Sequence, residues 1–300
     1  MLASKLSKSR YLSKVYLYVE NVRVPNWRGY LGIGMLGYIH TNTLWFYRVE
    51  DVMFEALTYL VSLAFFLSFA FSINNCFDAY SDSNDPKKRI RNPVARGVLS
   101  FREAYKISII LAFIGLILNM LFFPDFVVPL IYSSLIILAY FYSAPPLRLK
   151  SRPPFDLISH GLFFGSLLYL YGLAVNGKVY SYKSEYIALA ISIFVYSIIL
   201  ELRNHIEDYE VDRKTHVRTS AICLGLDRAL KLLEFLIGVH FTLLALLTYT
   251  IFQYEIMYLP YLSLFILLFL IIYGTGIDNN KCLRIMDITT SIVYLLCLLM

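Results

Sequence analysis

Residues 54–82 read FEALTYLVSLAFFLSFAFSINNCFDAYSD, an apolar run that passes directly into asparagine and aspartate. A helix needs about 20 mostly apolar residues to cross the bilayer core, and the run 54–75 supplies them. Its polar end carries Asn74, Asp78 and Asp82 in the pattern N-x3-D-x3-D. Because residues four apart share a helix face, these side chains are predicted to form one polar stripe at the end of a membrane helix.

The same pattern recurs after a second apolar run, 184–203, where Asn204, Asp208 and Asp212 repeat the spacing N-x3-D-x3-D. The two polar stripes stand at equivalent ends of two apolar runs. This likeness suggests an internal repeat of two helix pairs.

The composition indicates a membrane protein. Of 300 residues, 58% are hydrophobic and 16% are charged, with a mean hydropathy of +0.62. We predict one all-α domain over residues 1–300, a polytopic bundle of nine transmembrane helices capped by cytoplasmic loops and short helices, after a cytoplasmic segment 1–25. The predicted spans are 30–47, 54–75, 103–122, 126–144, 157–175, 184–203, 229–252, 256–274 and 283–300. The cysteines are scattered without a CxxC pair, which argues against disulfides and a zinc site.

The positive charges predict the orientation of the bundle. Basic residues gather in the N-terminal segment, including Lys5, Lys8 and Arg10, and in the connections 76–102, 145–156 and 204–228. The predicted connections on the opposite side carry only Arg48, Lys178 and Lys183. Lysine and arginine mark the cytoplasmic side, so both motifs and the N-terminus are predicted to lie at the cytoplasmic face of the cell membrane. The net charge of +6 then fits anionic lipid or an anionic substrate, not nucleic acid.

The carboxylates Asp78, Asp82, Asp208 and Asp212 predict a metal site. Stacked carboxylates at a membrane boundary repel each other and lose hydration, and a hard cation relieves both costs. Mg²⁺ is commonly shared between one or two carboxylates and substrate phosphates. We therefore expect two Mg²⁺ ions to clamp a diphosphate between the two motifs. The predicted diphosphate contacts are Asn74, Lys87 and Arg91 from the first motif region, and Arg213 and Arg218 from the second.

A third polar segment, YSAPPLRLK at 142–150, follows the fourth predicted span. Consecutive prolines end a helix and force an extended exit. Arg148 and Lys150 are therefore predicted to emerge beside the two motifs and contact the diphosphate. Tyr142 is predicted to end the apolar wall beneath them.

Together, these motifs resemble the UbiA superfamily of intramembrane prenyltransferases over nearly the whole chain. The superfamily pattern N-D-x-x-D-x-x-x-D is met by Asn74, Asp78 and Asp82, with Asn75 in place of the usual second Asp. The second pattern, D-x-x-x-D followed by a basic residue and R-T, is met at 208–219. Where some members carry a lysine four residues after the tyrosine, this chain has Pro146, as in the branch that resembles chlorophyll synthases and carotenoid elongases.

The resemblance implies Mg²⁺-dependent transfer of a prenyl group from a polyprenyl diphosphate to a lipophilic or aromatic acceptor within the membrane lipid. The four aspartates would ionise the donor through the metal. The Tyr142 ring would stabilise the allylic cation. Candidate contacts for the acceptor are Arg23, Asn204 and His205, with His205 as a candidate base.

Two other functions stay open on the sequence. A polyprenyl-phosphate phosphoribosyltransferase would use the same metal site for a sugar donor, and the run DPKKRIRNP at 85–93 is compatible with that branch. A cation-coupled transporter is less favoured, because carriers place ionisable residues near mid-membrane and the predicted spans are almost free of them.

Overall fold

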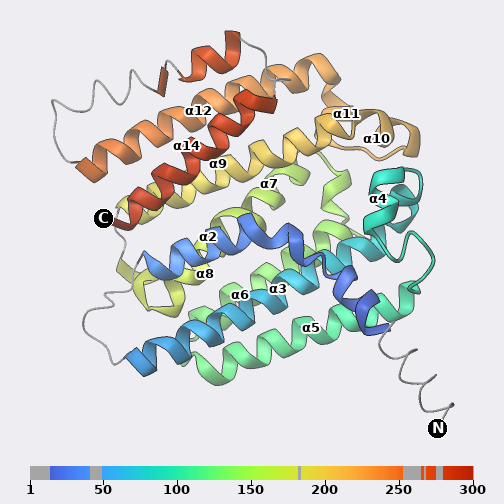
Figure 1. Cartoon of the computed structure of the whole chain (residues 1–300), viewed down its shortest axis with the longest axis horizontal. Helices are drawn as coiled ribbons and strands as arrows, with labels where there is room; N and C mark the ends of the chain where they lie inside the picture. Colours follow the sequence, from blue (N-terminus) through green and yellow to red (C-terminus); the bar gives the residue numbers. More distant parts are fainter. Residues whose placement is uncertain are drawn as a thin grey trace.

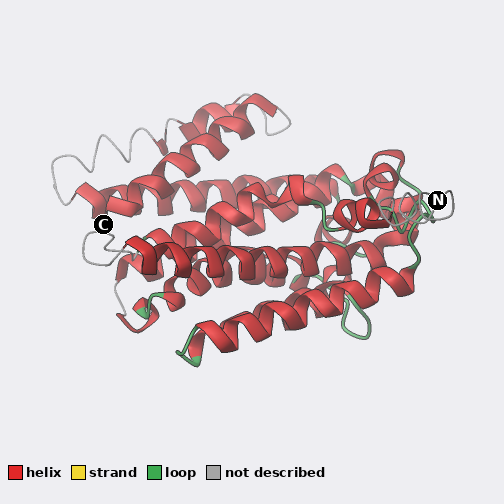
Figure 2. Ribbon diagram, turned by 60° about the horizontal axis from the view of Figure 1, so that its bottom comes forward, coloured by secondary structure: helices red, strands yellow, loops and turns green. Residues whose placement is uncertain are grey.

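The computed structural model describes residues 14–40, 49–181, 184–252, 265–266, 268–274 and 280–299, and this part of the chain forms helices and turns without a strand (Figure 2). The longer helices are α2 (Arg28–Ile39), α3 (Val49–Ser83), α5 (Phe101–Phe122), α6 (Val127–Ser143), α9 (Ser184–Glu207), α12 (Leu226–Phe252) and α14 (Asn280–Leu296). Two shorter helices, α7 (Phe155–Gly161) and α8 (Leu167–Val175), together make up one apolar span.

Five of these spans are long and apolar enough to cross a membrane, namely Met53–Ser83, Phe101–Phe122, Phe155–Val175, Ser184–Glu207 and Leu226–Ile251, and α6 is a shorter apolar helix. The all-helical bundle is confirmed, while the count of nine membrane helices stays a prediction. Residues 41–47 of the first predicted span and 256–264 of the eighth lie outside the described residues. The same holds for Lys5, Lys8, Arg10, Arg48 and Lys183.

The long helices run side by side, and short helices gather at one end of them (Figure 1). The main helix pairs are α3 with α5, α2 with α8, and α9 with α12. Helices α2 and α8 approach so closely that a Cβ on Gly37 would lie 2.1 Å from the Tyr169 carbonyl oxygen. Only glycine fits there, because any side chain would collide with backbone.

Within the fifth predicted span, 157–175, the regular α-helix is interrupted. A wider turn, η3 (Leu162–Ser166), separates α7 from α8, and Gly165 within it has non-helical angles of φ −114° and ψ −107°. A Cβ on Gly165 would lie 2.9 Å from the Ser197 Cβ, so the turn packs tightly against α9. Wide turns of this kind often occur at functional sites. Here the turn follows His160, whose ring faces the cavity described below.

Short helices cap the end of the bundle where both motifs lie. They are η1 (Val24–Trp27), α4 (Pro86–Arg91), η2 (Leu149–Ser151), α10 (Tyr209–Thr215) and α11 (Ser220–Leu224). Helix α4 begins as its sequence predicts, since the Asp85 side chain accepts hydrogen bonds from the backbone N–H groups of Lys87 (2.7 Å) and Lys88 (3.2 Å). Helix α6 ends at Ser143, directly before Ala144 and the proline pair, as expected.

Candidate active site

Both aspartate motifs line one cavity of about 380 Å³. Its polar wall includes Asn74, Asp78 and Asp82 from α3 and Asn204, Asp208 and Asp212 from the end of α9 and from α10. Segments 120 residues apart in the sequence therefore meet here, as the Lys88–Asp208 contact also shows. The expected convergence of the two motifs is present in the structure.

The two motifs differ in backbone. Asn74, Asp78 and Asp82 stand on one unbroken helix, as their spacing predicts. The second motif crosses a break, because α9 ends at Glu207 and Asp208 has φ −88° and ψ 0° before α10 begins. The Asp208 N–H still bonds to the Asn204 carbonyl at 2.9 Å, and the Asp212 N–H to the Asp208 carbonyl at 2.9 Å. The spacing of four therefore keeps the three residues on one side despite the break.

Cations neutralise the first motif. The Lys150 ammonium contacts Asp78 directly, and Arg148 Nη2 lies 4.0 Å from the same carboxylate. Arg23 Nη2 lies 3.3 Å from Asp82 Oδ2. In the part of the chain that the structure describes, the buried Nε atoms of Arg23 and Arg148 have no hydrogen-bond partner.

Lys88 and Thr219 contact the carboxylates of the second motif. Lys88 Nζ lies 2.6 Å from Asp208 Oδ2, and Thr219 Oγ1 donates to Asp212 Oδ2 at 3.3 Å. Burial raises the pKa of the Asp212 carboxyl to about 6, with Lys88 opposing the shift and the Asp208 charge adding to it. Burial opposes the charged form of Lys88, but the Asp208 carboxylate outweighs it and raises the Lys88 pKa.

Of the basic residues predicted to contact a diphosphate, Lys150 and Arg91 line the cavity, and Arg148 borders it through Asp78. Lys87, Arg213 and Arg218 lie outside its lining. The physical reason is helix phase: Lys88 and Arg91 are three residues apart on α4 and share the face toward the cavity, whereas Lys87 points away. Arg213 pairs with Glu210 on the exposed surface at 2.8 Å, and Arg218 is exposed.

Asn75, which stands where the superfamily has an aspartate, has a different environment from its neighbour Asn74. It is fully buried, and its Nδ2 donates to the Asn21 carbonyl oxygen at 2.8 Å and to Asn21 Oδ1 at 3.1 Å. Asn92 Nδ2 in turn donates to the Asn75 carbonyl oxygen at 3.0 Å. Asn75 therefore ties the segment before Arg23 to α3 and does not face the cavity.

Aromatic side chains form the apolar lining of the cavity. They are Tyr30, Phe71, Tyr142, Phe163 and Phe164. Tyr30 stacks on Phe164 with ring centroids 4.1 Å apart, and the Tyr142 and Phe163 centroids are 5.1 Å apart. Tyr142, which the sequence predicts at the end of the apolar wall, is one of the aromatic residues that line the cavity with both motifs.

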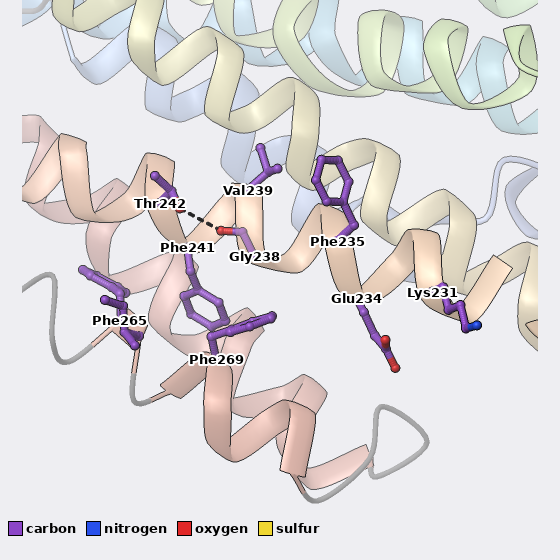
Figure 3. A pocket seen from close by; sticks show the side chains of 10 residues that line it. Lys231, Glu234, Phe235, Gly238, Val239, Phe241, Thr242, Phe265 and Phe269 are labelled. Carbon is purple, nitrogen blue, oxygen red and sulfur yellow. Dashed lines mark hydrogen bonds between the residues drawn. The ribbon is translucent and has the colours of Figure 1, made fainter. Parts of the chain in front are cut away.

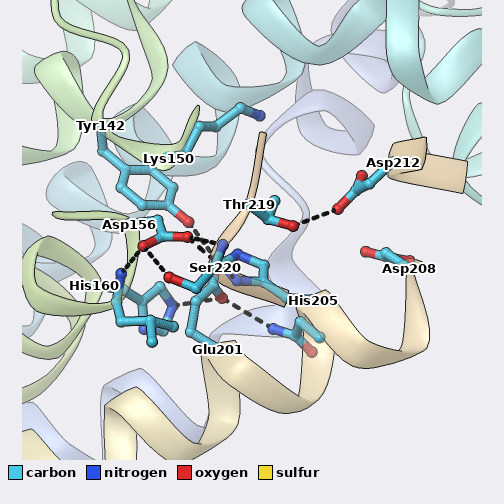
Figure 4. A network of polar contacts seen from close by, with 12 residues as sticks. Tyr142, Lys150, Asp156, His160, Glu201, His205, Asp208, Asp212, Thr219 and Ser220 are labelled. Carbon is cyan, nitrogen blue, oxygen red and sulfur yellow. Dashed lines mark hydrogen bonds and ion pairs between the residues drawn. The ribbon is translucent and has the colours of Figure 1, made fainter. Parts of the chain in front are cut away.

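A polar cluster that the sequence analysis did not single out lies beside Tyr142 (Figure 4). Its centre is Glu201, which is 8% exposed and lies within a predicted span. The Tyr142 hydroxyl, the Asn204 amide and the His160 and His205 rings all contact this carboxylate. The spans are therefore less free of ionisable groups than the sequence suggested, but these groups open onto the same cavity as the motifs.

The donor set fits a hard divalent cation. The four aspartates of the two motifs present carboxylate oxygens, the ligands that Mg²⁺ prefers. Within the described residues, no three His, Cys, Asp or Glu side chains converge as a complete metal site. Lysine and arginine side chains balance the carboxylates instead, as the ion pairs above show.

A second cavity, of about 560 Å³, lies between α12 and the residues Phe265, Ile266 and Phe269 (Figure 3). Phe235, Phe241, Phe265 and Phe269 line it, and among the described residues its charged side chains are Lys231 and Glu234. Without a carboxylate cluster, this apolar cavity does not offer the chemistry of the first one.

The fold and the cavity define an all-helical integral membrane protein with its polar site at one end of the bundle. The sequence matches the UbiA prenyltransferase family over residues 40–285, so the chain belongs to that family. The match covers both motifs and the segment between them.

Relatives and solved structures agree with this assignment. The chain is 31% identical over 163 residues to a lycopene elongase/hydratase of Halobacterium salinarum, covering 54% of this chain and 55% of that protein. It is 27% identical over 179 residues to a probable chloroplastic homogentisate phytyltransferase 2 of Oryza sativa subsp. japonica, covering 58% of this chain and 46% of that protein. The chain thus spans about half the length of these curated relatives.

Its fold matches that of a UbiA homolog from Archaeoglobus fulgidus, whose structure holds GPP and Mg²⁺. The TM-score is 0.71 at 22% identity, covering 94% of this chain and 98% of that one. At this identity the likeness establishes the shared fold.

Proposed function

We propose that this chain transfers a prenyl group from a prenyl diphosphate to a lipophilic or aromatic acceptor, with two divalent metal ions held at Asp78, Asp82, Asp208 and Asp212. One observation supports this most strongly: both carboxylate pairs, Lys88, Lys150 and Arg23 line a single cavity together with five aromatic side chains. The family assignment and the Mg²⁺ and GPP bound by the archaeal homolog point the same way.

The charged residues of the cavity prepare a diphosphate site. Bound Mg²⁺ would supply electrostatic stabilisation of the departing diphosphate. Lys88 and Lys150 would turn from Asp208 and Asp78 toward phosphate oxygens, because the metal then neutralises those carboxylates. Arg23 and Arg91 would complete the positive lining. Asn74 offers a neutral hydrogen-bonding group between the motif and the aromatic wall.

The aromatic lining suits the other half of the donor. Breaking the allylic C–O bond leaves a carbocation, and Tyr142, Phe71 and Phe164 line the same cavity as the carboxylates. A cation over the face of an aromatic ring gains about 2 kcal/mol or more where water is excluded.

The acceptor is proposed as a class only. The relatives named above carry a carotenoid and an aromatic acid in their names, and both are lipophilic or aromatic. Arg23 and Asn204 line the cavity and stay candidates for contacts with a polar acceptor group. Positive charge gathers at this end of the bundle, so we propose that the site and the N-terminus face the cytoplasm.

The test uses the purified full-length chain with radiolabelled geranylgeranyl diphosphate or phosphoribosyl diphosphate, each with total lipid extract. We expect label from the prenyl donor in a lipid product, diphosphate release, and loss of both on chelation by EDTA. Label from the sugar donor alone would replace the proposal with phosphoribosyl transfer. Transfer that continues in EDTA would remove the metal from the mechanism.

A further inference from the structure

The polar cluster around Glu201 joins α6, α7 and α9 and lines the same cavity as the aspartate motifs (Figure 4). The Tyr142 hydroxyl of α6 donates to Glu201, and the Nε2 atoms of His205 and His160 lie 3.1 Å and 3.3 Å from its two oxygens. Asn204 Nδ2 adds a hydrogen bond of 3.1 Å. The Glu201 carboxylate is thus surrounded by groups that can donate hydrogen bonds to it.

The geometry of His160 requires a proton between its ring and Glu201. Its Nδ1 atom lies 3.2 Å from the Ser197 carbonyl oxygen and 3.0 Å from Ser197 Oγ, which itself donates to the His160 carbonyl at 3.2 Å. Both Ser197 atoms therefore accept from Nδ1, which must carry hydrogen. Nε2 then faces a carboxylate oxygen, and this contact is favourable only when one of the two groups is protonated. The cluster therefore holds a proton that two groups share.

A second carboxylate, that of Asp156, lies near the Nδ1 atom of His205. Asp156 is fully buried, and its Oδ2 lies 3.6 Å from His205 Nδ1, an atom with no hydrogen-bond partner among the described residues. Ser220 donates to Asp156 through its backbone N–H at 2.5 Å and through Oγ at 2.6 Å. With one proton shared between His160 and Glu201, the two carboxylates and two imidazoles carry a net charge of −1, so the cluster can take up one more proton without becoming positive.

Interhelical hydrogen bonding alone does not explain where this cluster lies. Buried ionisable groups inside a membrane bundle are costly and usually functional. Tyr142, His160, Glu201 and His205 all line the cavity that holds the aspartate motifs. A purely structural cluster would gain nothing from opening onto a substrate site.

We propose that Tyr142 and Glu201 accept the proton that the acceptor loses during prenyl transfer, while His160 and His205 share its charge. This rests on the proposed prenyl transfer. It deepens that function by naming the acceptor class: a molecule that attacks with a carbon–carbon double bond or aromatic ring and then loses a C–H proton.

The allylic C–O bond breaks, and its electron pair leaves with the diphosphate. A π pair of the acceptor forms the new C–C bond, which leaves a cation on the acceptor. A neighbouring C–H bond then breaks, and its pair restores the double bond or ring. The proton passes to Tyr142 Oη, which simultaneously hands its own proton to Glu201. Glu201 becomes neutral, and no external oxidant or reductant is needed.

The variants Glu201→Gln and Tyr142→Phe test this step, because they keep side-chain shape and remove only the proton acceptor or the hydroxyl. The full-length protein is incubated with radiolabelled geranylgeranyl diphosphate and total lipid extract. Diphosphate release, prenylated lipid and geranylgeraniol are measured together. We expect diphosphate release within about threefold of wild type, but a ratio of prenylated lipid to geranylgeraniol lowered by about a hundredfold, the usual contribution of a general base.

Glu55→Gln is the matched control. Glu55 also accepts a hydrogen bond from a tyrosine, Tyr38, at 3.1 Å, but neither residue lines the cavity. It should leave the product ratio unchanged. A parallel fall of diphosphate release and product in both site variants would mean that the cluster is structural. An unchanged ratio in both would assign the proton to the departing diphosphate. A wild-type protein that releases no diphosphate would instead refute prenyl transfer itself.

Discussion

Lys88 Nζ lies 2.6 Å from Asp208 Oδ2, so the helix that follows the first motif is bound to the carboxylate of the second. The Lys88 side chain is 33% exposed, which leaves it room to turn toward an anion between the motifs. Lys87 is the next residue in the chain, yet it faces outward with Asn84 and Lys214. A comparison of Lys88 with Lys87 therefore distinguishes the effect of a cation in the cavity from the general effect of positive charge on α4.

Replacing Lys88 with Met should raise the KM for the prenyl diphosphate about ten- to a hundredfold. A hydrogen bond to a charged group contributes roughly 1.5–3 kcal/mol, and the substitution removes one such bond to phosphate. Lys87→Met carries the same charge change and should alter KM less than about twofold. Steady-state kinetics at fixed ionic strength provide the measurement. Equal effects of both substitutions would show that only the overall charge of α4 matters.

Replacing Asp78 or Asp208 with Asn should lower kcat by more than about a hundredfold while the protein stays folded. Each substitution removes one of the carboxylates proposed to hold metal, whose stabilisation of developing charge is worth several kcal/mol, and each 1.4 kcal/mol is about tenfold in rate. Initial rates across a Mg²⁺ titration, with thermal melting as the folding control, test this. Rates close to wild type at low Mg²⁺ would assign these carboxylates a structural role.

The raised Asp212 pKa predicts a pH-dependent stability of the metal-free protein. The carboxyl has a pKa of about 6 in the fold against an ordinary value of 3.8. A folded pKa above the unfolded one stabilises the protein most below pH 3.8, and this contribution is lost as the pH rises through about 6. In EDTA, the melting temperature of wild type relative to Asp212→Asn should therefore fall between pH 4 and pH 7. A constant difference across that range would contradict the shift.

Much of the site was predictable from local sequence. The spacing of Asn74, Asp78 and Asp82 determines their shared face on any continuous helix, and the proline pair at 145–146 determines where α6 ends. These features depend on helix periodicity and backbone restriction within a few residues. Both motifs and Tyr142 could therefore be located before the fold was known.

Other features depend on packing between distant segments. His160 and Glu201 are 41 residues apart inside two apolar runs, and only the contact of α7 with α9 makes them a pair. The choice of Lys88 over Lys87 depends on the phase of a six-residue helix. Neither leaves a periodic signal in the sequence, because each depends on where a neighbouring helix lies.

Replacing Asn75 with Asp should destabilise the protein without adding a metal ligand. Asn75 Nδ2 donates to two oxygens of Asn21, and an aspartate would turn carboxyl oxygens toward those acceptors in a site with no exposed surface. Leaving buried acceptors unpaired costs roughly 1–3 kcal/mol. Asn84→Asp, where an exposed amide donates to the Tyr80 carbonyl at 2.9 Å, is the matched control and should have little effect. Thermal melting and the Mg²⁺ dependence of activity test both variants, and tighter Mg²⁺ binding by Asn75→Asp would place residue 75 at the metal after all.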